Sequence, residues 1–400
     1  MKISAKTILV LTTLLILNVA AKADSYYSSV GLGIPDYFVS PQAAGMGGAG
    51  IAVQQYLSLN EMNPAALDLK GFTMISASFQ GEIVDHTVSG ESVQTRQGRA
   101  SGFRFVIPIK KNRFGLIAAL KPLTKSSMSV EFDQQVDELV TQRSISTSGG
   151  LHAASIGLKY AISQRLHVGG LFSFNFGSFN EKWSTKFNDD TYMDASDDLN
   201  SHMWGTGVEL GLIYYPRPII ALSGIVRSSS KLHIETKITP GSGITLEPIS
   251  QSADYPFGFG LGTALDFTKL LFAADYYSQQ WSEYRLDGSK GLKQSNYSRV
   301  SAGVEYINSK DFLTSYYKRI AIRFGGSWAQ LPFKDETGES VQELLATFGV
   351  GFPFNRNLGR IDLALEAGKR YSVDSSIYSE RIMRISASVT SAEKWFQRIF

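Results

Sequence analysis

Large apolar residues alternate with small or polar residues along most of the chain. In residues 256–267, Phe and Leu occupy nearly all the odd positions, and Gly, Ala or Asp occupies the even positions from 258 onward. A period of two is typical of a β-strand that has one apolar face. The same parity recurs at 204–214, 360–368 and 383–389. The pattern therefore predicts an all-β protein.

Segments of this kind number fourteen. They cover residues 71–83, 99–109, 113–131, 146–161, 165–184, 202–215, 219–236, 256–267, 270–285, 296–307, 319–330, 341–353, 360–372 and 379–390. Short polar connections alternate with longer ones, except that 308–318 is longer than the other connections on the short side. An even strand number with alternating short and long connections is typical of an outer-membrane barrel. We therefore expect a transmembrane antiparallel β-barrel of about fourteen strands.

Aromatic residues near the predicted strand ends separate this fold from the main alternative. A large secreted β-sandwich or propeller also shows alternation. A barrel in a bilayer additionally needs aromatic side chains at both interfaces. Candidates for these girdles are Tyr160, Phe176, Tyr214, Phe267, Tyr276, Tyr306 and Phe352.

The N-terminus has the features of a secretory signal peptide. Lys2 and Lys6 precede an apolar run from 8 to 20, and Ala21-Lys22-Ala23 resembles a cleavage site. After it, no stretch approaches the ~18 apolar residues that a membrane helix needs. We expect residues 1–23 to be removed after Ala23, residues 24–70 to form a separate N-terminal segment, residues 71–390 to form the barrel in the cell outer membrane, and residues 391–400 to form a tail.

Composition excludes several kinds of chemistry. The chain has no Cys, which removes thiol catalysis, disulfides and zinc–thiolate sites. Without the three Lys of the signal peptide, 36 basic residues face 36 acidic residues. A neutral exported chain with no basic cluster predicts no nucleic-acid binding.

Residues 24–70 are rich in Gly and Ala and do not alternate. They contain a literal G-x-G-x-x-G at Gly45, Gly47 and Gly50. A dinucleotide site needs a buried strand before this motif and a helix after it. Here Pro41 precedes it and alternating β segments follow. Small residues instead predict a backbone that packs closely inside a narrow space.

Two short motifs in this segment resemble the N-terminal hatch of the FadL-type outer-membrane transport family, whose relatives include PorV-like proteins. The motif residues are Gly45, Met46, Gly47, Gly48, Ala49, Gly50, Asn63, Pro64 and Ala65. The resemblance implies that residues 24–70 plug the lumen and that the protein is a passive channel. It also implies that hydrophobic compounds, such as long-chain fatty acids, leave sideways through the wall.

Charged residues on the polar face of the predicted strands are expected to line the lumen. They are Arg104, Lys159, Glu209, Asp275, Arg299, Glu305, Arg323, Asp362, Glu366 and Arg384. Equal numbers of acids and bases favour paired side chains, because unpaired charges in a narrow lumen are costly. Two interpretations remain open: a salt-bridge network that holds the hatch, and a polar route past it.

Catalytic and metal sites have little support. The five His residues, at 86, 152, 167, 202 and 233, lack H-x-H or H-x-x-x-H spacing, so no metal site is expected. Barrel hydrolases place Asp, His and Ser near the outer rim, and Ser201 with His202 is the one candidate pair. We expect no enzyme activity and no cofactor.

Two functions follow from these observations. The first is passive uptake of hydrophobic small molecules through an outer-membrane barrel. The second is a PorV-like interaction protein that assists secretion or surface attachment, for which the 391–400 tail and the external loops would be the contact regions. Expected partners are outer-membrane lipid, a hydrophobic ligand and the barrel-assembly machinery.

Overall fold

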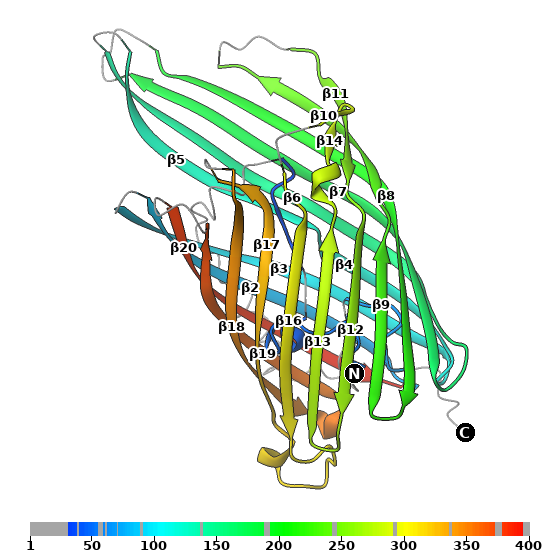
Figure 1. Cartoon of the computed structure of the whole chain (residues 1–400). Coiled ribbons are helices and arrows are strands. Elements are labelled where there is room, and N and C mark those ends of the chain that lie inside the picture. The colour runs from blue at the N-terminus through cyan, green and yellow to red at the C-terminus, as the bar shows by residue number, and fades with distance from the viewer. Residues whose placement is uncertain are drawn as a thin grey trace.

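In the computed structural model, a fourteen-stranded antiparallel sheet closes into a barrel around the N-terminal segment (Figure 1). The structure describes residues 31–37, 40–54, 59–60, 62–69, 71–88, 91–136, 139–187, 193–241, 246–290, 294–335, 338–372 and 378–394. The expected signal peptide lies outside the described residues, and so does most of the expected tail. No helix among the described residues is long and apolar enough to span a membrane.

Most wall strands are continuous. They are β2 (Thr73–Val88), β3 (Glu91–Lys110), β6 (Leu139–Ala161), β7 (Leu166–Phe187), β8 (Ala195–Arg217), β13 (Leu270–Gln279), β16 (Tyr297–Ile307), β17 (Ala321–Lys334), β18 (Ser340–Phe354), β19 (Gly359–Tyr371) and β20 (Tyr378–Glu393). Three wall strands are each interrupted once: β4 (Phe114–Pro122) with β5 (Thr124–Val136), β9 (Ile220–Arg227) with β10 (Ser230–Thr239), and β11 (Ile249–Tyr255) with β12 (Gly258–Asp266). The barrel closes where β2 pairs with β20, from Thr73↔Glu393 to Val88↔Tyr378.

The predicted alternation places apolar side chains outside and polar or small ones inside. On β6, Ile156 is 63% exposed whereas Ser155 is buried. On β8, Leu210 is 52% exposed and Glu209 is 3% exposed. Closure pairs the strand edges around the barrel except at one gap beside β3, and a bilayer requires such pairing because lipid offers no hydrogen bonds. The predicted barrel and its strand number are confirmed.

Several strand ends differ from prediction. β8 begins at Ala195 rather than 202, and β6 begins at Leu139 rather than 146. Most residues of these added segments are polar. Beyond the lipid no continuous apolar face is needed while backbone pairing continues. β13 ends at Gln279 rather than 285, since Trp281 turns inward and is buried. β20 continues to Glu393, so residues 391–393, predicted to begin the tail, belong to the barrel.

The described N-terminal residues 31–69, called the hatch below, fill the lumen (blue in Figure 1). They contain β1 (Ile34–Pro35) and the short helix α2 (Pro41–Ala44). Ser40 caps α2 by accepting a hydrogen bond from the Ala43 N–H, and Pro41 occupies the first turn, where no N–H is needed. The apolar core lies between the hatch and the wall. Met46, Ala49 and Ala65 pack there against wall residues such as Ile213.

Candidate functional site in the barrel lumen

Glycines allow the hatch and the wall to touch backbone to backbone. A Cβ atom at Gly325 of β17 would lie 2.2 Å from the carbonyl carbon of Met46, and one at Gly303 of β16 would lie 2.4 Å from the Met46 carbonyl oxygen. Gly47 has a φ of 71°, and a Cβ atom there would lie 2.3 Å from the Gly326 carbonyl oxygen. Any side chain at these positions would push the two surfaces apart.

Charged wall residues hold the backbone of the Gly-rich motif. The Asp275 carboxylate accepts hydrogen bonds from the N–H groups of Gly50 (2.5 Å) and Ile51 (2.8 Å). The Arg299 guanidinium donates to the Gly47 carbonyl at 2.9 Å. Asp275 and Arg299, both predicted to face the lumen, therefore bind the hatch rather than face open space.

Further wall residues bind the hatch at other points. Lys159 of β6 donates to the Leu67 carbonyl, and Arg360 of β19 donates to the Gln42 side chain at 2.9 Å. Arg360 was not among the sequence candidates.

The Asn63-Pro64-Ala65 motif is a turn docked against the wall. The Asn63 amide oxygen accepts from the Ala65 N–H at 2.8 Å, and its nitrogen donates to Ile51 O at 2.9 Å and to Ser223 Oγ at 2.6 Å. A Cβ atom at Gly211 of β8 would lie 2.0 Å from Asn63 Oδ1. Asn63 thus joins the two halves of the hatch to each other and to the wall.

Asn60 has a similar role that sequence analysis missed. Its amide nitrogen donates to the carbonyls of Gly50 (2.5 Å) and Val53 (2.8 Å), and its oxygen accepts from the N–H groups of Met62 and Asn63. An Asn just before a tight Pro-containing turn is a recognisable signal for such backbone capture.

Three predicted lumen residues form one buried ionic group. Arg323 Nε lies 2.6 Å from Glu305 Oε2, and Arg323 Nη1 lies 2.8 Å from Asp362 Oδ1. All three side chains are at most 2% exposed. Two acids around one Arg are further compensated by Arg360, which lies 2.8 Å from Asp362.

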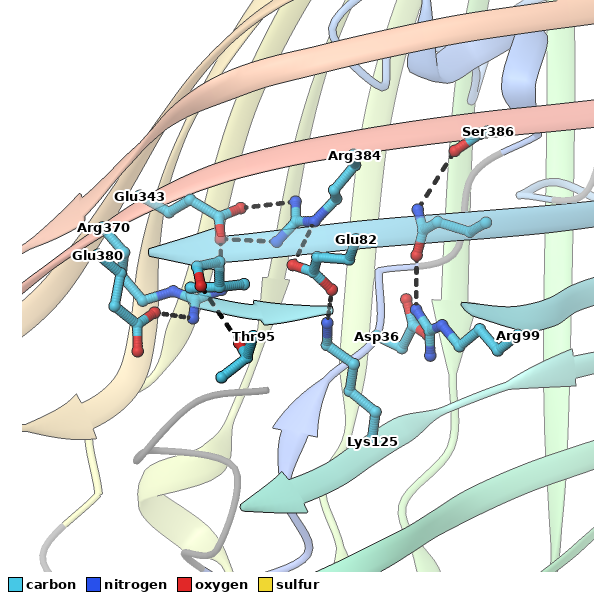
Figure 2. A network of polar contacts seen from close by, with 12 residues as sticks. Asp36, Glu82, Thr95, Arg99, Lys125, Glu343, Arg370, Glu380, Arg384 and Ser386 are labelled. Atoms are coloured by element: carbon cyan, nitrogen blue, oxygen red, sulfur yellow. Dashed lines mark hydrogen bonds and ion pairs between the residues drawn. The ribbon is translucent and has the colours of Figure 1, made fainter. Parts of the chain in front are cut away.

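A second ionic group joins β2, β5, β18, β19 and β20 near the end with the long connections (Figure 2). Arg384 bonds Glu82 at 2.8 Å and Glu343 at 3.0 Å. Lys125 bonds the same Glu82. Arg370 also bonds Glu343, at 2.7 Å, and Figure 2 shows it bonded to Glu380 as well. Of these residues, only Arg384 was predicted.

The remaining predicted lumen residues are buried in the barrel. Glu209 lies 2.7 Å from Lys121 and 2.8 Å from Arg227. Arg104 is fully buried and Glu366 is 3% exposed.

The wall is interrupted at its third strand. The ladder between β3 and β4 ends at Phe103↔Leu120, and among the described residues β5 pairs with β6 and the hatch but not with β3. Hatch residues occupy this place: Ile34 pairs with Lys125, and the Asp36 N–H donates to the Leu123 carbonyl at 2.9 Å. The Asp36 carboxylate is ion-paired with Arg99 of β3. The hatch therefore bridges the two unpaired strands.

The space beside this bridge is small, and both aromatic and charged side chains line it. Pro35 and Tyr37 of the hatch face Tyr255, Tyr277 and Tyr297 of the wall around a cavity of about 30 Å³. The Tyr37 and Tyr277 ring centroids are 4.7 Å apart. Burial raises the pKa of the Tyr37 phenol well above its usual range, so this ring stays neutral.

The opposite face of the hatch looks into a larger chamber, called the vestibule below, at the end with the short connections. Its volume is about 650 Å³, and it is lined by hatch residues Gln54 and Asp68 and by Arg165, Lys310 and Arg319 of the connections. One face of the hatch therefore lies against a small cavity lined by Tyr residues, and the opposite face lies against a larger chamber lined by charged residues.

Other sequence candidates are not assembled into a site. The Ser201 hydroxyl is hydrogen-bonded to Thr236 Oγ1 at 2.8 Å, on the neighbouring strand. In the part of the chain that the structure describes, no group of three or more His, Asp or Glu residues could hold a metal ion.

Comparison with known proteins agrees with this architecture. The chain matches the family model described as BamG over residues 3–242 and 226–399. Among curated proteins, no sequence matches the chain.

Solved structures share the fold at low sequence identity. The Ralstonia pickettii toluene transporter TbuX is 16% identical, with a TM-score of 0.61 over 88% of this chain and 97% of that one. A Pseudomonas aeruginosa FadL homologue is 13% identical, with a TM-score of 0.60 over 90% and 99%. The CymD monoaromatic hydrocarbon channel is 16% identical, with a TM-score of 0.58 over 90% and 98%.

Proposed function

Because the chain belongs to the BamG family and has the fold of FadL-type outer-membrane channels, we propose that it passes hydrophobic small molecules across the outer membrane. Monoaromatic hydrocarbons and long-chain fatty acids are the expected classes. The observation that carries this proposal is the missing pairing between β3 and β5, where hatch residues 34–37 occupy the wall.

An exit at this place suits an apolar molecule. Exposed apolar residues lie on both sides of the gap, including Phe103 of β3 and Phe132 of β5. A compound that leaves sideways would move from this cavity, which Asp36, Lys121 and Arg227 line together with the Tyr residues, past the Asp36–Arg99 ion pair and into lipid. Such transfer is favourable, because apolar area stays out of water throughout.

Passage requires the hatch to move. The aromatic cavity of about 30 Å³ holds roughly two water molecules and is too small for a benzene ring. Among the described residues, the hatch segment that closes it is held by two residues paired with β5, by the Asp36–Leu123 backbone hydrogen bond and by the Asp36–Arg99 ion pair. Displacing residues 34–37 would enlarge the cavity and open the wall in one step.

A disulfide lock tests this mechanism, because the chain has no native Cys. Pro35 and Thr124 are directly paired, and Cα atoms of such antiparallel partners lie ~4.5–5.5 Å apart, within disulfide range. We expect oxidised Pro35→Cys/Thr124→Cys protein to lose uptake of radiolabelled toluene or oleate by cells, and reduction to restore it. Each single Cys variant is the control. Equal uptake in both redox states would refute exit at this place.

The second candidate, a PorV-like interaction protein, is supported by how firmly the rest of the hatch is held. Asp275, Arg299, Lys159 and Arg360 bind it from four different strands. A permanently plugged barrel would serve as a platform for exported proteins or the assembly machinery. No uptake of either compound by the reduced protein, with retention of secreted proteins on the purified barrel, would favour this function.

A further inference from the structure

The longest short-side connection exposes apolar side chains to water. It spans residues 308–320 and contains the 3-10 helix η3 (Tyr316–Arg319). Leu313 is 78% exposed, Tyr317 is 70% exposed, and Phe312 and Tyr316 are about half exposed. Figure 1 shows this connection, in yellow before β17, projecting past the ends of the neighbouring strands. A cluster of this kind marks an interaction surface.

The adjoining vestibule is positively charged. Arg165, Lys310 and Arg319 line it together with Arg360, against the acids Asp68 and Asp266. Lys310 lies 3.6 Å from Asp266, and Arg360 is bonded to Asp362. Among the described residues, Arg165 and Arg319 form no ion pair; Arg319 Nη1 instead donates to the Asn357 side chain at 2.9 Å. Two guanidinium groups in this chamber are therefore not neutralised by acids.

We propose that connection 308–320 and the vestibule together form a docking surface for an acidic polypeptide segment that also carries apolar side chains. Short connections face the periplasm in outer-membrane barrels, so the partner is a periplasmic protein or domain. Apolar side chains of the segment would cover Leu313 and Tyr317, and its carboxylates would meet Arg165 and Arg319. This surface does not depend on the hatch opening.

The geometry favours a polypeptide over the membrane surface. The vestibule lies inside the wall and is floored by hatch residues Gln54 and Asp68, where a bilayer cannot reach. Its volume of about 650 Å³ falls in the range of pockets that enclose a compact ligand. Lys310 and Arg319 belong to both the projecting connection and the vestibule, which makes the two parts one continuous surface.

Site-specific photo-cross-linking in cells tests the proposal. The photoreactive residue p-benzoyl-phenylalanine replaces Leu313 in one variant. In the matched control it replaces Met193, which is 90% exposed at the opposite end of the barrel. The position-313 variant is then combined with Arg165→Glu and Arg319→Glu. In a charge-matched control it is combined instead with Lys231→Glu and Lys237→Glu, which lie on exposed positions of β10.

We expect a protein adduct at position 313 whose cross-linked peptide is acidic, and no such adduct at position 193. The Arg165→Glu/Arg319→Glu change should lower its yield by about tenfold, the loss expected for a close charge pair, whereas the β10 changes should leave it unaltered. Adducts to phospholipid alone would overturn the proposal in favour of a membrane contact. A protein adduct whose yield ignores the charge reversal would also overturn it. Heat-modifiable mobility of each variant verifies that the barrel has folded.

Discussion

At the scale of single residues, the hatch and the wall are joined by close backbone contacts at glycines. Met46 and Gly47 of the hatch lie against Gly303, Gly325 and Gly326 of the wall, and the missing side chains let one backbone touch the other. Interiors are packed too densely to absorb an added methyl group without rearrangement. Some glycines of the wall strands are therefore needed because the hatch backbone lies directly against them.

Substituting one of these glycines should loosen the hatch. In Gly325→Ala, the added methyl group would overlap Met46 and Gly47 backbone atoms at 2.2 and 2.3 Å, so we expect a loss of about 1–3 kcal/mol in stability. Gly224→Ala is the matched control, because its nearest neighbour would be the Leu261 side chain at 3.7 Å. Thermal unfolding measures both. Equal midpoints for the two variants would contradict this packing.

Arg323 distinguishes the two interpretations of the lumen charges. Arg323→Ala would leave Glu305 and Asp362 buried with one fewer cation, which should cost about 3–5 kcal/mol in stability. Adding Glu305→Gln and Asp362→Asn should recover part of that loss, because neutral amides are cheaper to bury. If Arg323→Ala changed channel conductance but not the thermal midpoint, the polar-route interpretation would replace the structural one.

Parity along the strands predicts inward positions, but it does not predict the partners of the residues there. Asp275 was predicted to line the lumen, yet its partners are backbone N–H groups at positions 50 and 51, which no side-chain pattern reports. Glu82, Lys125 and Glu343 occupy inward positions by the same parity and could have been included. Their association depends on strands that are distant in sequence.

At the scale of elements, the strands were predictable because lipid requires an apolar side chain at outward positions. The interruption at Leu123 was not, since residues 113–131 read as one strand in sequence. Lys121, Thr124 and Lys125 are all buried, because the hatch covers β5 where β3 does not pair with it. Alternation predicts which side chains face the lipid and which face the lumen. It does not predict which edge of a strand is hydrogen-bonded to a neighbour.

The bridge across this interruption should depend on Lys125. It links β5 to Glu82 of β2, beside the two residues of β1 that pair with β5. In Lys125→Met, Glu82 keeps Arg384 as a partner, so we expect the barrel to fold and the segment 31–37 to exchange its amide hydrogens faster. Lys182→Met, which removes an exposed ion pair of 4.0 Å, is the control. Unchanged exchange in this segment would show that Lys125 does not hold it.

At the scale of the whole molecule, a neutral mature sequence conceals a strong separation of charge. The six connections at the short-side end (111–113, 162–165, 218–219, 267–269, 308–320 and 355–358) contain eight Lys or Arg residues and one acid. The connections at the other end contain twelve Asp or Glu residues and three Lys or Arg residues. Net charge alone predicts no anionic partner, whereas this distribution favours one at the basic end.

The orientation of the barrel in the membrane decides which side the basic end faces, and labelling can test that orientation. Short connections of outer-membrane barrels face the periplasm, so the acidic end should face outward. With no native Cys, Met193→Cys and Leu313→Cys each provide a single exposed thiol, at 90% and 78% exposure of the original residue. We expect a membrane-impermeant maleimide to label position 193 in intact cells, and to label position 313 only after the outer membrane is permeabilised. The reverse pattern would invert the barrel and turn the basic vestibule toward the cell exterior, where a periplasmic partner could not reach it.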